Sequence, residues 1–114
     1  MRRGTLSLFF LLALLGSALA AIHYPALTGR VVDDAGVLSA GQGAALEQQL
    51  AAFESESGTQ LVVATLPSLQ GDTIEDYGYQ LGRNWGIGQK GKDNGALLIV
   101  ALQEKKVRIE VGYG

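Results

Sequence analysis

Carboxylates at the expected ends of helices and strands are the side chains of this chain best suited to chemistry. They are Asp33, Asp34, Asp72, Asp93 and Glu110. The chain has no cysteine and only one histidine, His23, which lies outside the expected strands and helices. These facts exclude thiol chemistry, a Ser-His-Asp triad and a site built from several histidines. The remaining oxygen ligands suit Ca²⁺ or Mg²⁺, so we expect neither zinc nor haem.

The expected order of strands and helices sorts these acids into two groups. Asp33, Asp34 and Asp72 follow the first two strands, and the carboxyl ends of parallel strands meet at the edge where open α/β sheets bind ligands. Asp93 precedes the third strand and Glu110 lies late in an antiparallel strand, so both belong to the opposite edge. We therefore predict a cation site at Asp33, Asp34 and Asp72, with the acidic edge of Asp93 and Glu110 as the alternative.

Each of these acids also has a structural interpretation, which the sequence leaves open. Asp33 or Asp34 fits a turn before the next helix, and Asp72 favours the start of a helix through the helix dipole. Asp93 fits a turn, and Glu110 fits a solvated strand face.

The segment "GIGQKG" at 86–91 matches the dinucleotide fingerprint G-x-G-x-x-G. That motif works only where a strand leads into a helix, whereas this segment leaves an expected helix and enters an expected strand. Asp93 also stands after Lys92 where a phosphate-binding loop needs a hydroxyl. We therefore expect no nucleotide, and we assign the glycines to tight turns. Lys90 and Lys92 are expected to be solvated, with phosphate binding as the alternative.

Capping signals and hydrophobic periodicity predict an alternation of strands and helices. Ser39 and Gln42 form a capping box, and Gly58 is a helix stop. Two continuous apolar runs indicate strands buried on both faces. The expected elements are a strand at 30–32, a helix from Ser39 to about Ser57, a strand at 60–66, a helix from Thr73 to about Trp85, and strands at 96–102 and 107–111.

The last expected strand alternates between apolar and charged residues. We expect Val107, Ile109 and Val111 to face inward and Arg108 and Glu110 to face outward. With one face in solvent, this strand completes a small α/β sandwich of the order strand-helix-strand-helix-strand-strand.

Residues 1–20 have the pattern of a secretory signal peptide. A basic start precedes an apolar run over 6–15, and small residues lead to a cleavage site after Ala20. The run is far shorter than the about 20 apolar residues that a membrane-spanning helix needs, and an uncleaved anchor is the alternative. We expect an exported protein with a flexible segment at 21–29 and one domain at 30–114.

The charge of the chain limits its partners. Its net charge is −2 at neutral pH, and removal of the two arginines near the start makes the exported part more acidic. Such a surface does not attract nucleic acid or anionic lipid. Another protein is therefore the type of macromolecular partner that we expect.

Three segments together resemble the TPM domain family, whose members are exported or thylakoid-lumen proteins with a TPM phosphatase-like domain. They are "VDDAGVLS" (32–39), "WGIGQKGKDNGALLIV" (85–100) and "RIEVGYG" (108–114). The resemblance implies a three-layer, Rossmann-like α/β/α sandwich and, in some members, an acidic site for a divalent cation. It also implies weak acid phosphatase activity in a few members and accessory roles in membrane complexes in others.

One departure from the family pattern concerns the C-terminus. The family's last motif normally continues into Leu-Glu-Gly and a further helix, and many bacterial members then add a membrane span. This sequence stops at Gly114. We interpret it as truncated, with the last helix of the domain missing, and expect membrane anchoring only through residues beyond Gly114.

Two functions fit these observations. The first is an accessory or interaction module of the cell envelope, periplasmic, secreted or membrane-associated, that contacts a membrane protein complex and binds Ca²⁺ or no ion. The second is a weak phosphatase in which Asp33, Asp34 and Asp72 hold Mg²⁺ or Ca²⁺ to polarise a phosphomonoester. We favour the first, because no residue stands out as an activated nucleophile.

Overall fold

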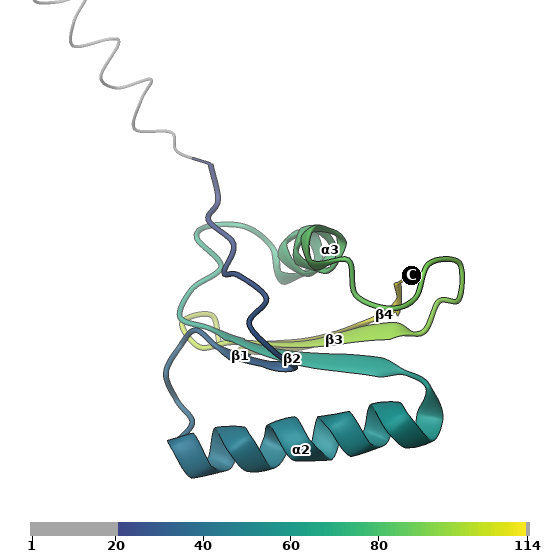
Figure 1. Cartoon of the computed structure of the whole chain (residues 1–114). Helices are drawn as coiled ribbons and strands as arrows, with labels where there is room; N and C mark the ends of the chain where they lie inside the picture. Colours follow the sequence, from purple (N-terminus) through teal and green to yellow (C-terminus); the bar gives the residue numbers. More distant parts are fainter. Residues whose placement is uncertain (1–20, 114) are drawn as a thin grey trace, which may run out of the picture.

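The computed structural model describes residues 21–113 of the chain (Figure 1). The expected signal peptide, 1–20, lies outside the described residues, so its cleavage and the export of the protein stay predictions. The elements are β1 (Val31–Asp33), α2 (Ala40–Ser57), β2 (Gln60–Leu66), α3 (Ile74–Trp85), β3 (Gly95–Ala101) and β4 (Lys106–Tyr113).

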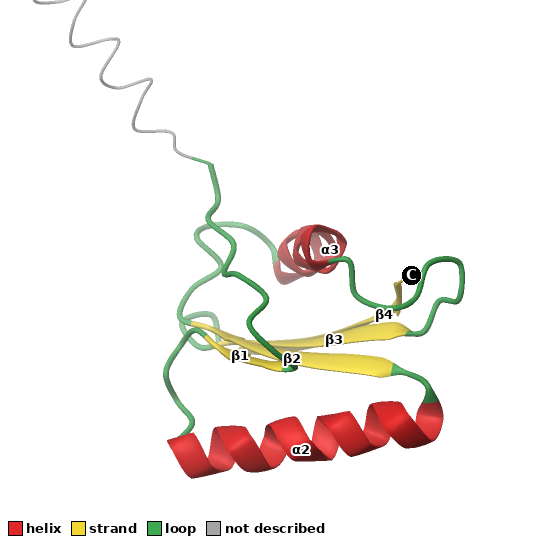
Figure 2. Ribbon diagram, in the orientation of Figure 1, coloured by secondary structure: helices red, strands yellow, loops and turns green. Residues whose placement is uncertain are grey.

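The four strands form one mixed sheet in the order β1-β2-β3-β4. The first three strands are parallel, and β4 runs antiparallel to β3. α2 packs on one face against β1 and β2, whereas α3 packs on the other face against β3 and β4 (Figure 2). The expected element order and the three-layer α/β/α sandwich are therefore confirmed. A further helix after β4 stays a prediction.

Both helices begin and end where the capping signals predict. Ser39 accepts the Gln42 N–H while the Gln42 side chain accepts the Ser39 N–H, which closes the capping box of α2. Gly58 ends this helix in the left-handed region, with φ 76°. Thr73 begins α3 by accepting the Asp76 N–H, and Gly86 ends it in the left-handed region, with φ 61°. Neither helix of the described part is long and apolar enough to cross a membrane.

The main hydrophobic core lies between the sheet and α3. The central strands β2 and β3 supply most of it, and the second face of β2 is buried beneath Leu50 of α2. Full burial of a large aliphatic or aromatic side chain contributes about 1.5–3 kcal/mol. The side chains that are at most 1% exposed in this core are Val62, Ala64, Leu66, Leu69, Tyr77, Leu81, Ile87, Leu97, Ile99 and Ala101.

The orientation predicted for the last strand is wrong. Val107, Ile109 and Val111 are 65%, 62% and 72% exposed, whereas the Glu110 side chain is only 14% exposed and lies with Arg108 on the α3 side. The apolar side chains point to the α2 face, but α2 reaches only β1 and β2. The charged side chains lie beneath α3, the helix that covers β4.

The segment at 21–29 is irregular, as expected, and is tied to the core. The side-chain amide of Gln70 donates to the carbonyl of His23 at 2.7 Å and accepts the His23 N–H at 2.9 Å. The Trp85 indole N–H donates to the carbonyl of Pro25 at 2.9 Å. The flexibility of this segment stays a prediction.

The glycine-rich segment at 86–91 packs its backbone closely against the backbone of Tyr113 and of Gly95. Gly88 has φ 89°, and a Cβ there would lie 2.5 Å from the carbonyl oxygen of Tyr113 and 2.8 Å from the nitrogen of Gly95. A Cβ at Gly95 would in turn lie 2.8 Å from the carbonyl of Ile87. This close approach explains these two glycines without a phosphate ligand.

Gly88→Ala is expected to lower the free energy of unfolding by about 1–3 kcal/mol, because its Cβ meets backbone atoms that cannot easily move. Gly43→Ala in α2 is the matched control, since a Cβ there meets nothing within 4 Å. That change should raise stability by roughly 0.5–1 kcal/mol. Urea unfolding measures both, and a Gly88→Ala variant as stable as wild type would contradict the close packing.

Candidate functional site

Asp33 connects β1 to the start of α2 and to β2. One carboxylate oxygen accepts the Thr65 hydroxyl at 2.6 Å and the Val37 N–H at 3.1 Å, and the other accepts the Leu38 N–H at 2.9 Å. The Thr65 hydroxyl, followed by the Leu38 N–H, lowers the pKa of Asp33 below its usual value. Asp33 therefore stays ionised and already has three donors within the chain.

Asp34 lies next to Asp33 at the carboxyl edge of the sheet. Both acids line a cavity of about 270 Å³ with Pro25, Ala26, Thr28 and Val32, which we call the carboxyl-edge cavity. Asp72 is not part of its lining, and its carboxylate accepts the Thr73 N–H at 2.8 Å at the start of α3. The structure thus brings two of the three predicted ligands together.

A divalent cation needs several oxygen ligands around one point. Within residues 21–113, no three acidic or histidine side chains come close enough to hold one ion together. Asp33 and Asp72 both fill structural roles that the sequence left open for them. A cation at Asp33, Asp34 and Asp72 stays a prediction.

Glu104, in the turn between β3 and β4, is a further acid at this edge, and sequence reasoning missed it as a site residue. Its Oε2 accepts the Leu69 N–H at 3.0 Å, while Oε1 is buried without a hydrogen-bond partner among the described residues. A hairpin turn after a parallel strand must lie at the carboxyl edge, so the predicted topology already contained this placement.

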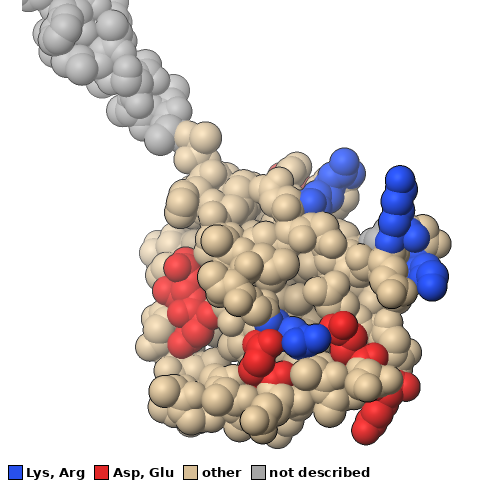
Figure 3. Space-filling view, in the orientation of Figure 1, with Lys and Arg blue, Asp and Glu red and all other residues tan. Residues whose placement is uncertain are grey.

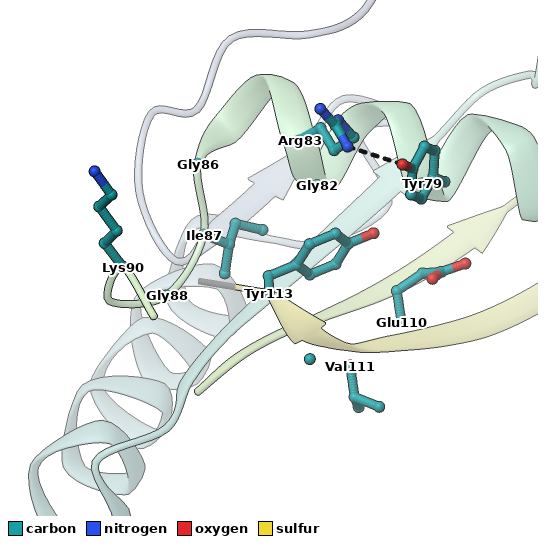
Figure 4. A pocket seen from close by; sticks show the side chains of 11 residues that line it. Tyr79, Gly82, Arg83, Gly86, Ile87, Gly88, Lys90, Glu110, Val111 and Tyr113 are labelled. Carbon is teal, nitrogen blue, oxygen red and sulfur yellow. Dashed lines mark hydrogen bonds between the residues drawn. The ribbon is translucent and has the colours of Figure 1, made fainter. Parts of the chain in front are cut away.

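A larger cavity, of about 550 Å³, lies at the opposite edge between α3, the glycine-rich segment and the end of β4 (Figure 4). We call it the amino-edge cavity. Glu110, the alternative site residue, is in its lining, but Asp93 is not. Asp93 sits in an exposed turn with φ 50°. The two alternative acids therefore share an edge of the sheet but not a cavity.

Three side chains of the amino-edge cavity were not expected from the sequence: Tyr79, Arg83 and Tyr113. Arg83 donates to the Tyr79 hydroxyl at 2.8 Å and lies 5.4 Å from the centre of that ring. The Tyr113 hydroxyl donates to the carbonyl of Gly78 at 3.0 Å. The available sequence signal for this cavity was the four-residue spacing of Gly78 and Gly82. Because these positions carry no side chain, α3 leaves room for the Glu110 and Tyr113 side chains of β4.

The charges of the amino-edge cavity are largely balanced within the chain. Arg108 donates to Glu110, and this contact raises the pKa of Arg108. Burial, followed by the nearby charge of Glu110, raises the pKa of Tyr113 to about 12. In Figure 4, Lys90 extends away from the cavity into solvent. The cavity thus offers a paired carboxylate and neutral hydroxyls, with Arg83 at its rim.

The two ends of the sheet differ in surface charge. Acidic side chains lie at the left of Figure 3, where Figure 1 places the carboxyl edge of the parallel strands, and also along the lower side over α2 as far as the lower right. Basic side chains gather at the upper right, towards the glycine-rich segment.

Comparison with known proteins places the chain among proteins with similar domains. A family model described as TPM domain matches residues 31–114. A search of curated proteins finds no match.

Two solved structures share the fold. The N-terminal domain of a P. gingivalis protein, determined in solution by NMR, superposes with a TM-score of 0.68 at 39% identity, over 76% of this chain and 55% of that one. The N-terminal domain of a Corynebacterium glutamicum protein superposes with a TM-score of 0.62 at 18% identity, over 82% of this chain and 60% of that one. The chain therefore spans less than two thirds of either domain.

The stability of the protein is expected to fall as the pH drops below about 4. The pKa of Asp33 is lower in the folded state than in the unfolded chain. Its stabilising contribution is therefore complete above the unfolded pKa and is lost as the pH falls through the folded pKa. Thr65→Val removes the main cause of the shift, so this variant should be less stable at pH 7 and less sensitive to pH between about 5 and 2.

Urea unfolding midpoints at pH 7, 5 and 2.5 measure this dependence. Asp34→Asn is the control, because this neighbouring carboxylate is exposed. It should leave the midpoints close to those of wild type. If the unfolding midpoints of wild type and Thr65→Val depend on pH in the same way, the hydrogen bond between Asp33 and Thr65 does not stabilise the folded protein.

Proposed function

This chain belongs to the TPM domain family, and from that premise we propose that it acts as an exported interaction module of the cell envelope. Its partner in this proposal is a protein of a membrane complex. The contact surface is the outward face of β4. We call this face the apolar strip, defined by Val107, Ile109 and Val111.

The exposure of the apolar strip is the observation that carries the proposal. Three β-branched side chains in a row are each more than 60% exposed. In the register of the sheet they lie beside Leu98 and Val100 of β3, which are half-buried on the same face. Contiguous apolar surface of this kind is uncommon on a soluble domain unless something binds there. A partner with aliphatic side chains would bury it.

Three pKa shifts among the described residues are of a kind that acid-base catalysis does not use. General acids and bases work best with pKa values close to neutral. Here burial raises the pKa of Tyr77 and of Tyr113 to about 12, and hydrogen bonds lower that of Asp33. Each of these shifts moves the group away from neutral pH, which is the opposite of what acid-base catalysis needs.

A photo-crosslinking amino acid at position 109 tests this function in the envelope of the cells that produce the protein. We expect a crosslink to one defined protein, because the strip would be buried in the contact. The product should disappear when Val107 and Val111 are both changed to lysine. The control is the same probe at Gln48, an exposed position on α2.

Two results would contradict the interaction module. In the first, positions 109 and 48 give the same products, so the strip has no special role. In the second, position 109 crosslinks only to another segment of its own chain, as a covering helix would produce.

Metal-dependent hydrolysis of phosphomonoesters is the second candidate function. The observation that favours it is the buried, unpartnered Oε1 of Glu104, since a bound cation would stabilise such a group. The loop before α3 connects to it: Leu69 donates its N–H to Glu104, and Asp72 donates its N–H to the Leu69 carbonyl at 3.1 Å. The sequence predicts Asp33, Asp34 and Asp72 as the ligands of Ca²⁺ or Mg²⁺, and binding would require Asp72 to approach the other two. A bound ion would polarise the phosphoryl group and activate water.

Turnover of p-nitrophenyl phosphate decides between the two functions. For an interaction module, we expect the same background rate with Mg²⁺, with Ca²⁺ and with chelator, and the same rate in Asp34→Asn and Asp72→Asn. Asp93→Asn, at the opposite edge, is the matched control. A chelator-sensitive rate that is lost in Asp72→Asn but kept in Asp93→Asn would favour the phosphatase.

A further inference from the structure

The outer edge of β4 has no strand beside it in the described part of the chain. Among residues 21–113, β4 is the last strand of the sheet and pairs only with β3. Its other edge therefore presents backbone N–H and C=O groups to solvent, and such an edge can pair with another strand. A register shift opposite Gly112, which has φ 90°, interrupts the ladder near its end. The regular part of the edge runs from Lys106 to Val111.

The sequence of this edge is complementary to itself. In an antiparallel pair of two identical strands centred on Ile109, Val107 lies opposite Val111 and Ile109 lies opposite its own copy. Arg108 lies opposite Glu110, and the symmetry repeats this pair. Aliphatic cross-strand pairs and pairs of opposite charge both stabilise antiparallel sheets.

Neighbouring registers lose this complementarity. Centring the pair on position 108 sets two arginines opposite each other, and centring it on position 110 does the same for two glutamates. A slip by a single residue would place the apolar side chains of one strand beside the charged side chains of the other. Like charges directly opposite are destabilising, so charge selects the register centred on Ile109.

We propose that β4 pairs in antiparallel orientation with β4 of a second copy of this chain, so that two sheets join into one through their edges. The pairing goes beyond the proposed function, because it uses the edge of β4 and not the face that carries the apolar strip. The edge is used for main-chain hydrogen bonds, and the apolar strip stays open. Side by side, the strips of the two copies form one wider apolar surface.

Arg108 and Glu110 each keep polar atoms that can bind the opposite residue of the second copy. Within one chain, Arg108 donates to Oε1 of Glu110 through Nε. Its terminal guanidinium nitrogens and Oε2 of Glu110 remain for the second copy. The Arg108 side chain is 39% exposed, so it can reach across the pair.

Charge reversal with cross-complementation tests the pairing. The purified protein is expected to be a dimer at about 100 µM by sedimentation velocity. Arg108→Glu places two glutamates opposite each other at both symmetric sites, and Glu110→Arg places two arginines there. Each variant alone should dimerise on the order of tenfold more weakly. An equimolar mixture of the two should recover the dimer mass, because every opposed pair is again of opposite charge.

A second variant keeps the test valid if a charge reversal prevents folding. Val107→Lys together with Val111→Lys changes only exposed side chains, and it sets lysines opposite lysines in the proposed register. This variant should be a monomer with an unchanged circular dichroism spectrum. Val37→Lys, at an exposed position in the loop before α2, is the control and should remain a dimer.

The pairing is overturned by a wild-type monomer at 100 µM, or by the two charge-reversal variants remaining apart when mixed. A dimer that survives Val107→Lys with Val111→Lys would also overturn it. Failure here is distinguishable from failure of the interaction module. A monomer that still crosslinks to an envelope protein through position 109 loses only the self-pairing, whereas a dimer without that crosslink loses only the outside partner.

Discussion

The continuous apolar runs of two neighbouring parallel strands are the constraint on which this structure depends. β2 and β3 carry continuous apolar runs, so each needs cover above and below. Parallel neighbours also need a crossover, which the chain supplies as α2 before β2 and α3 before β3. The two helices lie on opposite faces and towards opposite sides of the sheet. Within the described residues, that offset leaves β4 covered by α3 alone.

The sequence was sufficient for the elements and their order, because those follow from local signals. The capping box at Ser39, the stop at Gly58 and the cap at Thr73 each act within a few residues, and the helices begin and end there. The orientation of β4 could not be obtained in this way. Its alternation shows that its two faces differ, but only tertiary packing determines which face a helix covers. The usual preference for apolar residues inside was overridden, because α2 does not reach this strand.

The sequence predicted at which edge of the sheet each acidic residue lies, but not which hydrogen bonds its side chain makes. Parallel topology places Asp33 and Asp34 at one edge and Glu110 at the other, as expected. Whether a carboxylate is free depends on donors from other segments, and Asp33 receives one from Thr65, which lies 32 residues further along the chain. The role of Gly78 and Gly82 in shaping the amino-edge cavity also depends on which strand passes beneath them.

Among residues 21–113, the offset of the helices leaves β4 with two different uncovered surfaces, and this is why one strand can serve two contacts. Its face offers aliphatic side chains, which favour any apolar partner and carry little register information. Its edge offers directional main-chain groups flanked by alternating charges, which favour one register and one orientation. The two surfaces are roughly perpendicular, so occupation of the edge does not cover the face. Pairing of two copies would instead enlarge the apolar surface offered to a third protein, and self-association would then strengthen the binding of an outside partner.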